Sequence, residues 1–380
     1  DVSGVVRLYL PVNALADYRL NASLLVSDAM MSLRGIDYPV TELNGPVELD
    51  RTRLSSKSID GRFLGQPISI ALRHPMSSEA GLTQVVEVSG ETPMPDISAA
   101  LRIPLPNRYT GSIAWESQVL FPALDAGDSR QFEILVESDL QGLAIDMPAP
   151  LFKTAGVADP LTASVRFPTS GVFDVLANSK SGISANLRFE KANFGWAFQS
   201  AALNVGALIP KLPETPGLAV SGTFDGLSIE EWLSVASEYA RTADSGKSGE
   251  GNFLREVDIY AKDLQFFGYR FPDSTVSALQ AQGVWNLDID GPRASGSLAV
   301  PSDFSGDKPL VGDMSRLVLQ NENDDSVDPN EATTDNFIDP RDFPSLSIQI
   351  ASFIIDDMNF GKLDASVWRT DRGLKAERIV

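Results

Sequence analysis

Apolar and polar residues alternate along most of this chain. In one typical run, Leu187 and Phe189 are separated by polar Arg188 and preceded by Asn186. A period of two predicts β-strands with one apolar face and one solvated face. This pattern is typical of antiparallel sheets, because parallel sheets are usually covered on both faces and show continuous apolar runs. The sequence therefore predicts an all-β protein with a mostly antiparallel sheet.

Turn signals separate the alternating runs. Examples are Asn44-Gly45-Pro46, Asp60-Gly61 and Asp290-Gly291-Pro292, and such clusters of Gly, Pro, Asn and Asp favour tight connections between strands. Several runs also share a strand-then-proline form without a fixed period, as in 99–104 and 296–301. Loose repetition of this kind indicates β-units stacked along one axis, as in solenoids.

One segment has helical periodicity. Ser228 and Glu231 form a capping box, in which the hydroxyl accepts from the backbone of the first turn. Apolar residues that include Ile229, Trp232 and Leu233 then fall on one helical face. We predict a helix at about 228–241, with its apolar stripe packed on the sheet.

Two segments have the composition of loops. Residues 242–252 are rich in Gly, Ser and Lys, which favours a flexible linker. Residues 321–342 carry eight acidic side chains and one arginine, which favours a solvated acidic loop over a calcium site, because the regular spacing of a calcium-binding loop is absent. The predicted organisation is a first segment at 1–241, the linker at 242–252 and a second segment at 253–380.

Composition and charge exclude several function classes. The chain has 380 residues and a net charge of −20, which disfavours nucleic acid as a partner because a phosphate backbone needs a basic surface. It has no cysteine and a single histidine, His74, so cysteine metal sites, zinc hydrolase chemistry and serine–histidine catalysis are disfavoured. No pair of carboxylates is marked as buried, which leaves a carbohydrate-cleaving enzyme as a distant alternative. We predict no catalytic residue, no metal and no cofactor.

The chain contains no apolar run of the ~20 residues that a membrane-spanning helix needs. It begins and ends inside strand-like sequence, near Val5 and Ile379. The expectation at this point is a soluble piece excised from a longer protein.

Several strings, taken in order, resemble the YhdP family of the AsmA-like superfamily, which includes TamB. The resemblance covers essentially the whole chain and corresponds to the central and C-terminal part of that family. The strings that carry it are Leu43-Asn44-Gly45, 58–67, 139–143, 147–153, 226–232, 283–285, 296–298, Pro344-Ser345-Leu346 and 359–363.

This resemblance implies a fold and a function. The fold is a long, twisted sheet folded lengthwise into an open hydrophobic groove, β-taco or solenoid-like, with one or few short helices; the second segment is then an AsmA-like groove segment. The protein is expected in the periplasm of a Gram-negative envelope, held to the inner membrane by an N-terminal anchor that this sequence lacks. It is expected to carry phospholipids toward the outer membrane without catalysis, and to meet the outer membrane or envelope proteins at its far end.

Two further expectations follow. The alternative function is a periplasmic scaffold or assembly factor for outer-membrane proteins that acts by pairing strands with its clients. For lipid transport, the groove-lining residues are the apolar members of the alternating runs. They are Leu24, Ile97, Leu101, Ile103, Phe132, Ile134, Val136, Val165, Phe167, Ile183, Leu187, Phe189, Val257, Ile259, Trp285, Leu287, Ile289, Leu346, Ile348, Ile350, Leu363 and Val367.

Overall fold

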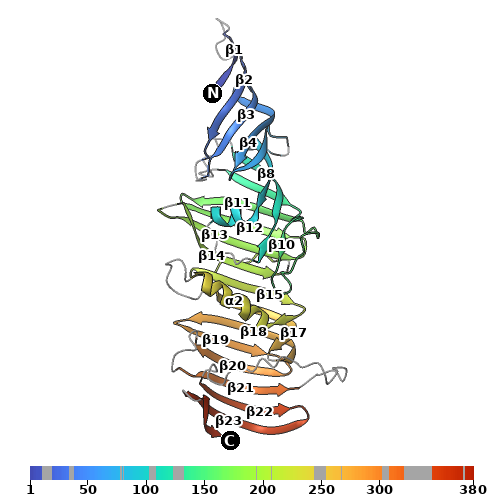
Figure 1. Cartoon of the computed structure of the whole chain (residues 1–380), viewed down its shortest axis with the longest axis vertical. Coiled ribbons are helices and arrows are strands. Elements are labelled where there is room, and N and C mark those ends of the chain that lie inside the picture. The colour runs from blue at the N-terminus through green and yellow to red at the C-terminus, as the bar shows by residue number, and fades with distance from the viewer. Residues whose placement is uncertain are drawn as a thin grey trace. The chain divides into compact units, whose positions relative to one another are not determined.

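The structure is a computed structural model of the whole chain. It describes residues 1–10, 19–33, 38–77, 79, 81–101, 108–122, 132–193, 195–206, 208–243, 254–266, 268–301, 308–320, 345–370 and 373–380. Hydrogen bonding places 22 strands of this part of the chain in one large, mostly antiparallel sheet (Figure 1), and β7 (Tyr109–Thr110) and β10 (Ala144–Ile145) in a two-stranded sheet. The all-β, mostly antiparallel fold that the alternating runs predict is confirmed.

The chain divides into two compact units. Unit 1 comprises 1–147, 151–201 and 209–212, and unit 2 comprises 148–150, 202–208 and 213–380. Unit 1 contains the elements β1 (Val2–Tyr9), β2 (Arg19–Met31), β3 (Val40–Asp50), β4 (Arg53–Phe63), β5 (Gln66–Arg73), β6 (Leu82–Pro93), α1 (Met94–Leu101), β7 (Tyr109–Thr110), β8 (Ser112–Pro122), β9 (Glu133–Ser138), β10 (Ala144–Ile145), β11 (Leu161–Thr169), β12 (Val172–Ser179) and β13 (Ile183–Lys191).

Strand β14 (Trp196–Val205) begins in unit 1 and ends in unit 2. Unit 2 then contains β15 (Gly217–Phe224), β16 (Leu227–Ser228), α2 (Ile229–Ala243), β17 (Leu254–Phe266), β18 (Tyr269–Ala281), β19 (Val284–Asp290), β20 (Ala294–Pro301), β21 (Leu310–Leu319), β22 (Leu346–Ile355), β23 (Met358–Thr370) and β24 (Gly373–Ile379).

Most neighbouring strands pair antiparallel, in the order in which they occur along the chain. Unit 2 departs from this pattern at three places. Strands β15 and β16 both pair parallel with β17, and β21 pairs parallel with β22. A parallel pair needs a crossover connection, and α2 lies in the connection between β16 and β17.

The structure corrects the predicted strand near residue 100. Residues Met94–Leu101 form helix α1, so Ile97 and Leu101 are helical, and Ile103 lies outside the described residues. Met94, Ile97 and Leu101 are three and four residues apart, so the same apolar positions also fit a helix. Alanine at 99 and 100 favours the helix. The Tyr38 hydroxyl fixes its last turn by donating to the backbone oxygen of Ala100 at 2.5 Å.

The helix predicted at 228–241 is confirmed as α2, Ile229–Ala243. Its predicted cap is present, because the Ser228 hydroxyl accepts a 3.4 Å hydrogen bond from the backbone nitrogen of Glu231. Of the predicted linker at 242–252, the first two residues belong to α2 and the rest lie outside the described residues. The acidic loop at 321–342 also lies outside them.

Candidate functional site

The candidate site is the apolar face of the sheet. We use this term for the side of each unit's sheet that carries its hydrophobic clusters, and polar face for the opposite side. Residues directly opposite each other on neighbouring strands form rows across the sheet, because paired side chains point to the same side. In unit 1 one such row crosses seven strands, β5, β6, β8, β9 and β11–β13. This aliphatic row consists of Leu72, Val86, Val119, Ile134, Val165, Val175 and Leu187.

An aromatic row lies beside the aliphatic row, two residues along each strand. Phe132 and Phe167 have ring centroids 4.7 Å apart, and Phe173 and Phe189 have centroids 4.6 Å apart. The row begins with Phe121 on β8 and ends with Trp196 and Phe198 on β14. Because neighbouring centroids are separated by 4.6–6.0 Å along the row, the rings are close enough for favourable edge and offset contacts.

The row on the other side of the aliphatic row has short side chains. Ser117 lies opposite Val136, Val136 opposite Ala163, and Ala177 opposite both Ala163 and Ala185. We call this the alanine row. On the apolar face of β9 and β11–β13, the side chains therefore become smaller from the aromatic row through the aliphatic row to the alanine row.

A second part of the apolar face of unit 1 lies on β2–β6. Its buried members come from β3, β4 and β5 and are Leu43, Val47, Ile59, Ile68 and Ile70. Leu24 on β2 pairs with Val47 in the register of this face and is half-buried. The structure therefore places the first predicted lining residue on the same side as a buried apolar cluster.

Unit 2 has an apolar face of the same construction. One row crosses all seven strands from β17 to β23 and consists of Ile259, Val276, Ile289, Gly296, Met314, Ile350 and Leu363. The row beside it consists of Val257, Ala278, Leu287, Leu298, Gly312, Ile348 and Ala365. Each row contains one glycine, Gly296 on β20 in the first and Gly312 on β21 in the second. A Cβ at Gly296 would clash with the backbone oxygen of Asp313.

Helix α2 packs on this apolar face. Ile229 and Trp232 contact the cluster of unit 2, which includes buried Phe224, Ile259 and Ile350. One turn later Val235 is 3% exposed. Helix α2 contacts β17 (Figure 1), as expected of a helix in the crossover between parallel strands.

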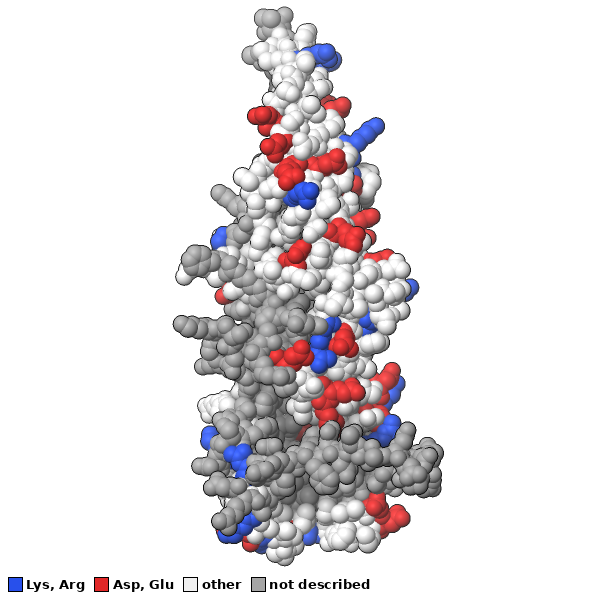
Figure 2. All heavy atoms as spheres, in the orientation of Figure 1, with Lys and Arg blue, Asp and Glu red and all other residues white. Residues whose placement is uncertain are grey.

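The polar face carries ion pairs between neighbouring strands. The Arg188 guanidinium donates two hydrogen bonds of 2.7 Å to the Asp174 carboxylate on β12, and Arg166 donates one of 2.7 Å to Glu133. The hydrogen bonds that Arg188 donates to Asp174 raise the pKa of Arg188. Figure 2 shows acidic and basic side chains interspersed on the visible surface. The ion-paired side chains of Glu133 and Arg188 thus lie on the polar face, the side of the sheet to which sequence alternation assigns them.

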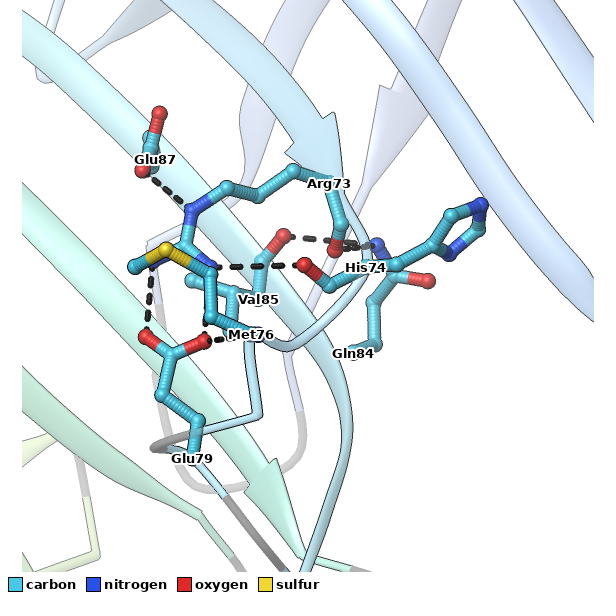
Figure 3. A network of polar contacts seen from close by, with 7 residues as sticks. All are labelled: Arg73, His74, Met76, Glu79, Gln84, Val85 and Glu87. Atoms are coloured by element: carbon cyan, nitrogen blue, oxygen red, sulfur yellow. Dashed lines mark hydrogen bonds and ion pairs between the residues drawn. The ribbon is translucent and has the colours of Figure 1, made fainter.

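The strongest polar network closes the connection between β5 and β6 (Figure 3). Arg73 donates to both carboxylate oxygens of Glu79, at 2.7 and 2.9 Å, and to Glu87 at 2.5 Å. The backbone nitrogen of Met76 also donates to Glu79, at 2.7 Å. The hydrogen bonds from Arg73 and Met76 lower the pKa of Glu79 to about 2. The imidazole of His74 is directed away from this network (Figure 3), so the network is an anchor for the turn and does not involve the histidine ring.

The structure brings most of the predicted lining residues together within their own units. The unit 1 members on β9–β13, with Phe132 immediately before β9, share its apolar face, and Ile183 joins them through its place on β13. The unit 2 members on β17, β19, β22 and β23 share the apolar face of that unit. The exceptions are Ile97 and Leu101 in α1, and Ile103, which is outside the described part of the chain.

Sequence reasoning did not single out several residues that belong to the apolar face. These are the aromatic residues Phe121, Phe173, Trp196 and Phe198 and the members of the alanine row other than Val136, which was predicted. The alternation signal contains all of them, but alternation does not state which strands pair or in which register. Among the described residues, no group of three or more His, Asp or Glu side chains is placed to hold a metal ion.

Together these features define a class of protein: an all-β protein in which the sheet of each unit keeps one face apolar over seven strands. A family model described as YhdP protein matches residues 1–380. The chain therefore belongs to the YhdP family, and the resemblance seen in its sequence is confirmed. No curated protein and no solved structure matches it.

Family membership and the apolar sheet together fit lipid transport in general and an envelope protein. The family is not in general one of enzymes. Within the described ranges, no helix has the length and apolarity needed to cross a membrane.

Proposed function

We propose that this chain conducts phospholipids between the inner and outer membranes of a Gram-negative envelope, with acyl chains lying on its apolar face. The observation that carries the proposal is the set of apolar rows, which cross seven strands in each unit. Members of these rows such as Val165, Val175 and Leu187 are only half-buried. Apolar surface therefore remains available to a ligand.

The apolar rows can hold an acyl chain without fixing it at one position. Burial of each methylene contributes about 0.8 kcal/mol, so two acyl chains together have a strong preference for this face over water. Hydrophobic contact has no preferred direction, and rows of similar side chains offer similar contacts on successive strands. A lipid tail is thus held on the face and can still move from one strand to the next.

The alanine row suggests where a tail lies in unit 1. The side chains of Ala163, Ala177 and Ala185 are much shorter than the aromatic rings on the other side of the aliphatic row. An acyl chain above the alanine row gains contact with the flank of the aliphatic row without displacing a large side chain. We infer that an acyl chain lies along this row where it crosses β9 and β11–β13.

The remainder of the proposal concerns location and partners. The protein acts in the periplasm as part of an inner-membrane-anchored chain, its ligands are phospholipids, and its far end meets the outer membrane or envelope proteins. It carries out no reaction and takes no cofactor. The YhdP family and the apolar sheet support this view.

A photo-crosslinking amino acid placed at Leu187 or at Arg188 tests the proposal. These neighbours point to opposite faces, since Leu187 pairs with Val175 while Arg188 pairs with Asp174. In cells, crosslinking at Leu187 should capture phospholipid and crosslinking at Arg188 should not. Equal capture at both positions, or capture only at 188, would contradict lipid transport on this face.

The alternative is a scaffold that pairs strands with its clients, which requires an exposed sheet edge. Lipid extraction of the purified chain separates the two functions, because stoichiometric phospholipid favours transport and its absence favours the scaffold.

A further inference from the structure

Helix α2 places a buried hydrogen-bond donor on the apolar face of unit 2. In the described part of the chain, four buried side-chain atoms have no hydrogen-bond partner: His74 Nδ1, Asn186 Oδ1, Asn204 Oδ1 and Trp232 Nε1. The two asparagines each use their amide nitrogen, Asn186 toward the Pro210 oxygen and Asn204 toward Ser221. Trp232 differs because Nε1 is the only polar atom of its side chain.

Helix α2 holds Trp232 against the apolar cluster. The helix begins at a Ser228 cap, and Ile229 and Trp232, one turn apart, both contact the buried residues of unit 2. Val235, one turn further, is almost completely buried. The Trp232 side chain is therefore partly buried against this cluster, and its Nε1 atom is buried without a hydrogen-bond partner.

Another indole in the chain shows how such a donor is ordinarily satisfied. Trp115 lies on the apolar face of unit 1, against the cluster of β3–β5. Its Nε1 donates a 2.9 Å hydrogen bond to the hydroxyl of Thr92, which is 2% exposed. A buried donor without an acceptor costs free energy, and a tryptophan N–H usually finds a partner when it is buried. A ligand with an acceptor atom beside Trp232 Nε1 would therefore remove this cost.

The chemistry of a phospholipid supplies such an acceptor in the right place. In a diacyl lipid each acyl chain ends in an ester, so the carbonyl oxygen is the polar atom nearest to the hydrocarbon. Tails lying on the apolar cluster of unit 2 would bring that oxygen to the border between apolar and polar surroundings. Tryptophan is suited to this border, because its ring is apolar and its N–H is polar.

We propose that the indole N–H of Trp232 donates a hydrogen bond to the ester carbonyl oxygen of a phospholipid on the apolar face of unit 2. This inference rests on the proposed function and adds a positioning residue to it. This hydrogen bond sets the position of the glycerol ester relative to α2. The site accordingly prefers ester-linked over ether-linked phospholipids, because an ether lacks the carbonyl oxygen.

A competition between two lipids tests the inference. The full chain is exposed to an equimolar mixture of ester-linked and ether-linked phosphatidylethanolamine of equal chain length, and bound lipid is extracted and quantified by mass spectrometry. One neutral hydrogen bond predicts about fivefold enrichment of the ester lipid. Trp232→Phe should remove the enrichment, whereas the matched variant Trp368→Phe should keep it, because Trp368 is 38% exposed and lies on the polar face of β23, next to Val367.

The outcomes separate the two proposals. Binding of neither lipid would contradict the proposed function, and equal binding of both lipids to the unmodified protein would overturn only the role of Trp232. Enrichment that persists in Trp232→Phe would overturn it as well. If the phenylalanine variant is poorly folded, 3-benzothienyl-alanine at position 232 keeps the double ring without the N–H, and it should also abolish the enrichment.

Discussion

Phe173 and Phe189 stack face to face on adjacent strands, with ring centroids 4.6 Å apart and ring planes inclined by 13°. Phe189 is completely buried and also contacts Phe198 edge-on. These contacts place Phe189 at the centre of the aromatic row of unit 1. The row is therefore a source of stability as well as a part of the apolar face.

Phe189→Ala should lower the free energy of unfolding by about 3–5 kcal/mol, because it removes a large buried side chain and leaves a cavity. Urea unfolding followed by circular dichroism measures this change. As a control, Phe152 is 60% exposed, and Phe152→Ala should change stability by less than about 0.5 kcal/mol. Similar effects of both variants would show that the aromatic row does not stabilise unit 1.

Ala177→Leu should reduce lipid capture without unfolding the protein. The larger side chain would stand in the alanine row between Ala163 and Ala185, where we place the acyl path. Asn178→Leu is the matched control, because Asn178 is exposed and points to the other face. Crosslinking at Leu187 in each background, with thermal unfolding as a check of folding, should show a large loss of phospholipid only for Ala177→Leu. An equal signal in both backgrounds would remove the alanine row from the path.

Glu79 makes the stability of unit 1 depend on pH in the acidic range. Its pKa is about 2 in the folded protein, below the ordinary value of a glutamate, so its ionised form favours folding. This contribution is fully present above about pH 4.5 and is lost as the pH falls toward 2. Glu79→Gln should therefore be less stable than the unmodified chain at pH 6, and the difference should shrink toward pH 2. Denaturant titrations between these values measure it, and a difference independent of pH would contradict the role of the Arg73 network.

Gly296→Ala should be destabilising by about 1–3 kcal/mol. Gly296 has a φ of +144°, and a Cβ there would lie within 2.5 Å of Asp313 and Met314 backbone atoms, so both backbone strain and overpacking contribute. Gly226 is the control, since a Cβ there would have nothing within 4 Å. Chemical denaturation of both variants distinguishes them, and a neutral Gly296→Ala would mean that β20 and β21 can separate at low cost.

The sequence predicts the strands and their apolar faces because a period of two is strong and local. Leu287 and Ile348 both show it, and both lie in one row of unit 2. The same reasoning is wrong at Ile97 and Leu101, where three- and four-residue spacing is superimposed on alternation. A short apolar segment can satisfy both periods, and its surroundings then decide between them.

The register across strands could not be predicted, because it depends on contacts between residues far apart in the chain. Phe173 and Trp196 pack together although 23 positions separate them. Local sequence periodicity does not predict that contact. The parallel pairing of β15 with β17 is likewise set by the crossover through α2. The orphan N–H of Trp232 is visible only once the helix is placed on the sheet.

Each strand that a row crosses contributes one side chain to that row, so the number of strands sets the length of the row. Insertion of a hairpin of two strands would add two members to each row and leave the registers on either side unchanged. A single-residue insertion within one strand would instead turn that strand's remaining side chains to the wrong face. The fold thus permits growth by whole hairpins, and the number of side chains in each row rises with the number of hairpins.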